Sequence, residues 1–143
     1  MRVDVQTHHM PDAYVKALAE RSDYPRFESA GGSGQALGNP QVKLPMEAGL
    51  LDLSVKLEEM DIHQIDLALI SLNIPGPDLA GEPSEADELA RIGNDGIADA
   101  VSRHPGRFRG AARGGSRAKL HRSRSSRHGG RARRRDAGRP SSP

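Results

Sequence analysis

An apolar run at residues 65–72 restricts this chain to a small set of folds. The run reads Ile-Asp-Leu-Ala-Leu-Ile-Ser-Leu, so only two of its residues are polar. A strand that faces water on one side alternates apolar and polar residues, whereas a nearly continuous apolar run is typical of a strand buried on both faces of a parallel sheet. Parallel strands are joined by crossover connections that normally contain a helix. The run therefore predicts an α/β fold.

Another strand is predicted at residues 2–7, directly before His8 and His9. Successive side chains of a strand point to opposite faces, so one face here is apolar and the other polar. In a parallel barrel the polar face lines the interior, and the C-terminal end of the strand opens on the active site. The alternative is a surface strand whose histidines have no function. We expect Val3 and Val5 to pack against helices, with Thr7 on their face and Asp4, Gln6 and His8 on the other face.

Helical and loop patterns account for the rest of the first 112 residues. Apolar residues recur at helical spacing in three segments, while glycine and proline are concentrated in two segments that we expect to lack regular structure. Ser84 is the expected start of the third helix, with Asp87 in a capping-box position, and Lys56 is expected on the exposed side of the second. The predicted order is strand 2–7, helix 12–21, loop 22–45, helix 51–63, strand 65–72, loop 73–83, helix 84–104 and strand 107–112, with the first two strands parallel neighbours.

Length and composition set the broad class. A chain of 143 residues without cysteine has room for one domain and has no disulfide framework or thiolate metal site, so a cytoplasmic location is the default. No apolar run approaches the roughly 20 residues of a membrane helix, and the N-terminus lacks the pattern of a secretory signal. We therefore expect a soluble protein with no membrane partner.

The charge divides the chain into two unlike parts. Residues 1–112 hold 10 Lys or Arg and 18 Asp or Glu, a net charge of −8, whereas residues 113–143 hold 11 basic residues and one Asp, a net charge of +10. Leu120 is the only large apolar residue after position 112, so we expect residues 113–143 to be a disordered Arg-rich tail. The tail has no aromatic residue to stack on bases, so any binding of nucleic acid is expected to be electrostatic and non-specific. For the origin of this tail, we favour a frameshift after codon 112 over a selected nucleic-acid-binding arm.

Three stretches of the first 112 residues carry a family resemblance. The first is Val-Asp-Val-Gln-Thr-His at residues 3–8, and the second comprises residues 56–61 and 65–71. The third runs from Ala90-Arg91-x-x-Asn94-Asp95 to Arg-His-Pro-Gly-Arg-Phe-Arg-Gly at residues 103–110. Together they resemble the amidohydrolase-related family, the metal-dependent barrel enzymes that include aminocarboxymuconate semialdehyde decarboxylase. The resemblance implies the N-terminal portion of a (β/α)8 TIM-type barrel, which needs about 250 residues when complete.

The resemblance also implies a metal site on the first strand. The family pattern there is Asp-x-His-x-His, and two histidines at i and i+2 can hold one divalent metal. His8 matches the second histidine, and Gln6 stands at the position of the first. An amide oxygen is a poorer ligand for zinc-like metals than an imidazole nitrogen, so the site is expected to be weakened, to hold a different metal, or to have lost it. His9 lies on the opposite face of a regular strand and is not an expected ligand.

The resemblance thus implies a metal-dependent hydrolase or decarboxylase of the amidohydrolase-related type, acting on a small carboxylated compound such as an aromatic acid. Zinc or manganese is the implied cofactor, and no catalytic residue is identified. Residues 1–112 are expected to form a partial barrel domain, truncated and inactive as given, because the family's other ligands come from later strands. Its unfinished sheet is expected to favour self-association. The alternatives are a nucleic-acid-binding protein that acts through its tail and an inert fragment.

Overall fold

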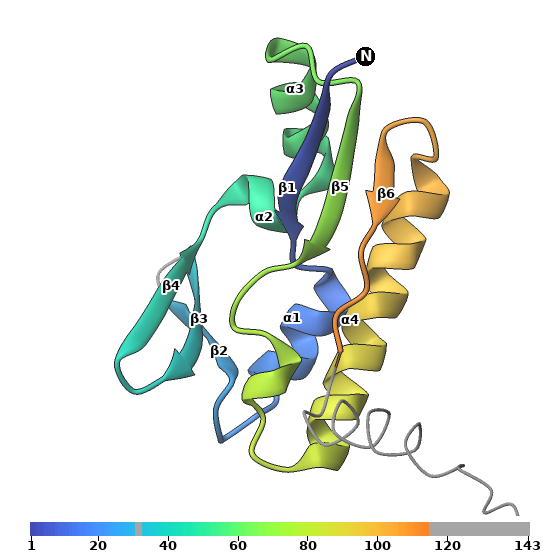
Figure 1. The fold of residues 1–143 in the computed structure, drawn as a ribbon. Coiled ribbons are helices and arrows are strands. Elements are labelled where there is room, and N and C mark those ends of the chain that lie inside the picture. The colour runs from blue at the N-terminus through green and yellow to red at the C-terminus, as the bar shows by residue number, and fades with distance from the viewer. Residues whose placement is uncertain (31–32, 115–143) are drawn as a thin grey trace, which may run out of the picture.

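The computed structural model describes residues 1–30 and 33–114, which form two small sheets and a set of helices (Figure 1). The parallel sheet has the strand order β1-β5-β6, and the antiparallel sheet has the order β2-β3-β4. The strands are β1 (Val3–His9), β2 (Arg26–Ala30), β3 (Ser33–Asn39), β4 (Val42–Met46), β5 (Leu67–Leu72) and β6 (Phe108–Gly110). The helices are α1 (Asp12–Ala19), α2 (Ala48–Leu51), α3 (Leu53–Ile62), the short 3-10 helix η1 (Pro77–Leu79) and α4 (Pro83–Arg103).

The parallel sheet confirms the strands and the pairing predicted from the sequence. β1 and β6 each pair in parallel with β5, the strand formed by the apolar run. Along β5, buried and partly buried residues alternate. We call the side that carries Ala68, Ile70 and Leu72 the helix face, because these buried residues share one apolar core with residues of α1, α3 and α4. The opposite side, which carries Leu67, Leu69 and Ser71, is called the open face.

Helix α4 packs closely against the end of β5. A Cβ atom built on Gly93 would lie 2.4 Å from Cδ1 of Leu72, a distance that real Cβ atoms essentially never show. Glycine at this position therefore lets the helix backbone approach the strand. The contact fixes α4 beside β5 and β6, as Figure 1 shows, and so places the C-terminal ends of the strands relative to the loop that follows β5.

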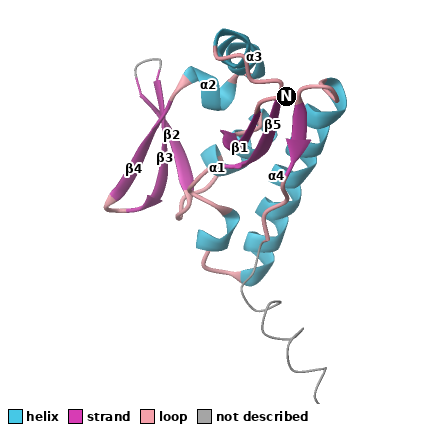
Figure 2. Ribbon diagram, turned by 45° about the horizontal axis from the view of Figure 1, so that its top comes forward, coloured by secondary structure: helices cyan, strands magenta, loops and turns pink. Residues whose placement is uncertain are grey.

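The segment predicted as a long irregular loop is instead an antiparallel sheet, so that prediction is wrong for the described part of residues 22–45. Its glycine and proline residues suggested a loop, but apolar side chains of β2 and β4, Phe27 and Leu44, pack against the core. Gly34 leaves the space that the Phe27 ring occupies. Asn39 accepts a hydrogen bond from the backbone N–H of Gln41 at 2.9 Å and forms the turn between β3 and β4. Figure 2 shows this sheet set apart from β1, β5 and β6.

Two helix boundaries differ from the prediction. Helix α4 begins at Pro83 and not at Ser84, because proline suits the first helical position and no side chain caps the helix. The helix predicted at 51–63 is divided into α2 and α3 at Asp52, whose carboxylate accepts a hydrogen bond from the backbone N–H of Ser54 at 2.7 Å. The loop at 73–83, predicted to lack regular structure, contains the 3-10 helix η1.

Lys56 was also wrongly predicted to be exposed. Its side chain on α3 is buried, with only 9% exposed, and burial lowers the pKa of its ammonium group. A long aliphatic stem can cover apolar surface while the charged end reaches a polar group. Here the ammonium group interacts electrostatically with Glu59 and Asp4.

The interpretations of the tail fall outside the described residues, except at Arg113 and Gly114. Disorder, nucleic-acid binding and the frameshift after codon 112 therefore stay predictions. Over residues 1–30 and 33–114, no helix combines the length and apolar character that crossing a membrane requires.

Tyr14 on α1 supplies a first stability prediction. Its side chain is fully buried, and its hydroxyl donates a hydrogen bond to the carbonyl oxygen of Pro75 at 3.1 Å. Replacing Tyr14 with phenylalanine keeps the ring but leaves the Pro75 carbonyl without this donor. We expect the free energy of unfolding to fall by about 1 kcal/mol, measured by urea titration followed by circular dichroism.

The same substitution should change the response to alkaline pH. Burial raises the pKa of the Tyr14 phenol above its usual value of about 10, so its stabilising contribution is present below pH 10 and is lost as the pH rises further. The wild-type chain should therefore lose more stability between about pH 10 and 11 than Tyr14→Phe does. Equal losses in the two chains would contradict this assignment.

Candidate metal centre

The C-terminal ends of β1 and β5 bring the candidate ligand His8 beside Ser71. The two residues are paired in the register of the strands, and Nδ1 of His8 lies 3.2 Å from Oγ of Ser71. His8 is partly exposed, and its pairing with Ser71 places it on the open face. The hydroxyl can hold the imidazole through Nδ1, which leaves Nε2 as the nitrogen available to a ligand.

A bulge in β1 changes which residues share a face. Asp4 pairs with Ala68 and Thr7 with Ile70, so β1 has one more residue than β5 in this interval. Two residues of β1, one of them Gln6, therefore stand opposite a single residue of β5. Asp4 lies on the helix face, opposite to His8, and the prediction that these two residues share a face is wrong.

The predicted burial of the valines of β1 is wrong for the same reason. Val3 and Val5 are 40% and 72% exposed, and neither packs into the helix layer. Strict alternation assumed a regular strand, whereas the bulge shifts the alternation by one residue between the two halves of β1.

His9 lies in the helix layer and has a different environment from His8. It is buried, with 4% exposed, and Nδ1–H donates a hydrogen bond to the carbonyl oxygen of Leu50 at 3.0 Å. Burial lowers the pKa of the imidazole below its ordinary value. His9 borders a cavity of about 790 Å³ whose other lining residues include Asp52 and His104 but not His8. The two adjacent histidines therefore face different surroundings.

Asp4 is held as a carboxylate by its neighbours. The Thr7 hydroxyl and the backbone N–H of Gln6 donate to its two oxygens, and these hydrogen bonds lower its pKa. The Lys56 ammonium acts in the same direction. Sequence reasoning assigned Asp4 no role, although its place before Gln6 in the family pattern was visible.

A second polar cluster, which sequence reasoning missed, lies where β5 and β6 end. The Asn94 side chain accepts a hydrogen bond from the backbone N–H of Arg113 at 2.8 Å and donates one to its carbonyl oxygen at 2.9 Å. The Arg113 guanidinium reaches the carbonyl oxygen of Leu72 at 3.3 Å and lies 3.6 Å from Asp78. Arg113 was assigned to the tail, so the signal that could have located this cluster was Asn94 in the third matching stretch.

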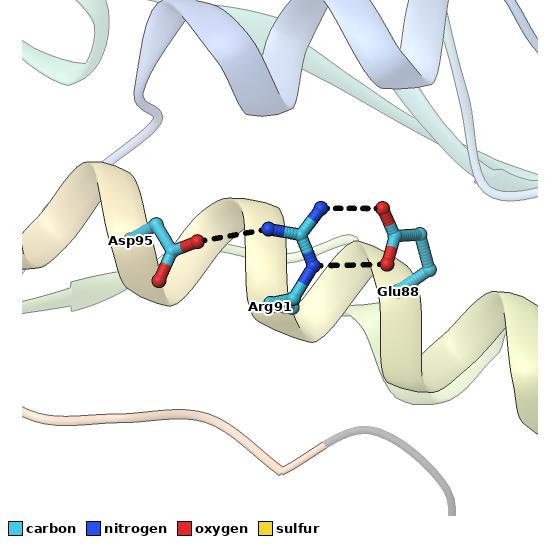
Figure 3. A network of polar contacts seen from close by, with 3 residues as sticks. All are labelled: Glu88, Arg91 and Asp95. Carbon is cyan, nitrogen blue, oxygen red and sulfur yellow. Dashed lines mark hydrogen bonds and ion pairs between the residues drawn. The ribbon is translucent and has the colours of Figure 1, made fainter.

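The other polar residues of that stretch lie on the surface. Arg91 bonds to Glu88 at 3.0 and 2.6 Å and to Asp95 at 3.1 Å, along the exposed side of α4 (Figure 3). Solvent screens exposed ion pairs of this kind, so they contribute little to stability. Arg91 and Asp95 are therefore not part of the candidate centre.

The donor set fits part of a metal site and not a whole one. In the region that the structure describes, no group of three or more His, Cys, Asp or Glu side chains could hold a metal ion. The donors that the sequence predicted are the imidazole of His8, on the open face, and the amide of Gln6, which is exposed in the bulge. They supply chemistry suited to one side of a divalent ion.

Sequence and fold comparisons agree with this partial architecture. The described mixed α/β fold is that of one portion of the amidohydrolase barrel, and no family model matches the chain. The likeness to amidohydrolase-fold decarboxylases predicted from the sequence is confirmed for this portion.

The particular relatives are decarboxylases. The chain is 40% identical over 68 residues to gamma-resorcylate decarboxylase of Rhodococcus jostii RHA1 and 37% identical over 68 residues to that of Polaromonas sp. JS666. Each match covers 47% of this chain and 21% of the relative, so the chain spans about a fifth of the length of these curated relatives.

Two solved structures show the same fold over more of the chain. The apo form of Metarhizium anisopliae IDCase has a TM-score of 0.65 and 25% identity, covering 78% of this chain and 34% of the other. The 5-carboxyvanillate decarboxylase of Novosphingobium aromaticivorans, complexed with manganese and a nitrobenzoic acid, has a TM-score of 0.56 and 20% identity, covering 90% and 39%.

Proposed function

We propose that residues 1–112 are the first part of a metal-dependent decarboxylase that acts on a small aromatic carboxylate, with His8 as a metal ligand. The observation that carries the proposal is the position of His8, at the C-terminal end of β1, on the open face and beside Ser71. The C-terminal ends of barrel strands are where barrel enzymes place their active sites. Decarboxylases among the relatives and a neighbour with bound manganese support the reaction type and the metal.

The residues of β1 would contribute one side of the metal's coordination shell. Ser71 orients the His8 ring through Nδ1, as outer-shell partners do at metal-bound histidines, and Nε2 would be the ligand atom. Gln6 would offer its amide oxygen, a weaker donor than imidazole for zinc-like metals. When bound, a divalent ion polarises a substrate carboxylate or carbonyl. The other ligands would come from segments that the longer relatives contain.

Manganese binding by the chain tests this proposal directly. Electron paramagnetic resonance of free Mn²⁺ should show weak binding to the 143-residue chain and loss of that binding in His8→Ala. His9→Asn is the matched control, because the asparagine amide can still donate to the Leu50 carbonyl while the imidazole is removed. Equal losses in the two variants, or no binding by the wild-type chain, would refute the assignment of His8.

Substitution of Gln6 is expected to strengthen metal binding, whereas substitution of His8 is expected to weaken it. Gln6→His replaces an amide oxygen with an imidazole nitrogen at an exposed position of the bulge. We expect Mn²⁺ or Zn²⁺ affinity to rise by about tenfold, a change of roughly 1.4 kcal/mol, measured by isothermal titration calorimetry. An unchanged affinity would show that ligands from outside β1 limit the site.

A further inference from the structure

The bulge in β1 has an internal hydrogen-bonding partner. A bulge leaves backbone groups of the longer strand without partners in the ladder. Here the Gln6 N–H donates to Oδ1 of Asp4 at 2.9 Å, and the Thr7 hydroxyl donates to Oδ2 of Asp4. The Asp4 carboxylate therefore spans the bulge and satisfies groups that pairing with β5 does not.

The bulge decides which face each histidine occupies. Before it, Val3 pairs with Leu67 on the open face. With strict alternation from Val3, His9 would share that face and His8 would lie on the helix face. With the extra residue, His8 lies on the open face and His9 is buried in the helix layer.

We propose that Asp4 is a positioning residue that stabilises the bulge and thereby holds His8 on the open face and His9 in the helix layer. Its consequence for metal binding rests on the proposed function, whereas its effect on the strand does not. Two independent features support the role: the carboxylate uses both oxygens within the bulge, and the buried Lys56 of α3 provides a positive charge near it.

Nuclear magnetic resonance of the labelled 143-residue chain can report the two faces separately. In the wild type, cross-peaks should connect the His8 ring with the Ser71 side chain and the His9 ring with residues around Leu50. Asp4→Ala should abolish the His8–Ser71 cross-peak and shift the Gln6 amide upfield as its carboxylate acceptor is removed. Asp4→Asn keeps an oxygen acceptor for Gln6 and should restore much of the wild-type pattern. An unchanged His8–Ser71 cross-peak in Asp4→Ala would overturn the proposal.

A remote contact separates repositioning from unfolding. The Asn94 side chain bonds to the backbone of Arg113 in the second polar cluster, and its amide resonances should stay unchanged in Asp4→Ala. If those resonances are lost as well, Asp4→Ala has unfolded the chain, and substitutions of Thr7 then test whether the bulge positions His8. Thr7→Val removes the hydroxyl donor at nearly constant volume, and Thr7→Ser keeps it. A weaker His8–Ser71 contact only in the valine variant supports the proposal, and equal behaviour of the two overturns it.

Manganese titration of the same variants distinguishes this inference from the proposed function. If the wild type binds Mn²⁺, the affinity should fall in Asp4→Ala in parallel with the His8–Ser71 cross-peak and recover in Asp4→Asn. Unchanged affinity despite a lost cross-peak would overturn the positioning of the metal ligand. If the wild type binds no Mn²⁺, the proposed function fails, and the cross-peaks alone decide whether Asp4 sets the register of β1.

Discussion

Replacing Phe108 with alanine is expected to lower the free energy of unfolding by about 3–5 kcal/mol, the usual cost of removing a buried aromatic ring. Phe108 begins β6, is fully buried, and pairs with Ala68 of β5. Its ring lies edge-on to His104 at 5.8 Å between ring centres. Since domains are stable by only about 5–15 kcal/mol, this loss would be a large fraction of the total free energy of unfolding.

Urea titration followed by circular dichroism measures this loss, and Val5 provides a matched control. Val5→Ala also removes apolar atoms from the parallel sheet, but its side chain is 72% exposed, so we expect a change within about 0.5 kcal/mol. Similar effects of the two substitutions would contradict the packing of β6 against β5 and α4.

The parallel sheet could be predicted because its central strand has a characteristic apolar sequence. A nearly continuous apolar run such as residues 65–72 is typical of a strand in a parallel sheet, although only the helix face of β5 is fully buried here. The helix before it and α4 after it follow from apolar residues at helical spacing. These are local signals, so one sequence is enough to read them.

The faces of β1 could not be predicted from alternation, since one extra residue reverses it. The hydrogen bonds from Gln6 and Thr7 to Asp4 that hold the bulge have no signature distinct from an ordinary polar strand. Similarly, the composition of residues 22–45 indicated a loop, although Phe27 packs over Gly34 within a sheet. In both places the outcome depends on pairing between strands, which a periodicity analysis does not include.

His8 was selected as a candidate ligand because it matches the second histidine of the family pattern, and its role as a ligand stays a prediction. The structure places it beside Ser71, a neighbour that the sequence could not indicate. Arg113 was missed because its charge groups it with the basic tail. Its contacts with Asn94 and Leu72 join residues far apart in the chain.

A large loss of turnover on substitution of His8 is expected in a chimeric enzyme. Joining residues 1–112 of this chain to the remaining length of the Rhodococcus jostii relative supplies the segments that this chain does not match. If the proposal is correct, the chimera forms a metal-dependent decarboxylase. Removing a metal ligand should cost more than the roughly 10–100-fold loss that follows removal of an outer-shell partner, so His8→Ala should lower turnover by more than about 100-fold.

Release of CO₂ from gamma-resorcylate by this chimera in saturating Mn²⁺ is the measurement that tests the central claim most directly. Our account predicts turnover by the chimera, its loss in His8→Ala, and turnover within a few-fold of the unsubstituted chimera in His9→Asn, with all three folded by circular dichroism. A folded chimera without turnover, or equal losses in the two histidine variants, would contradict it.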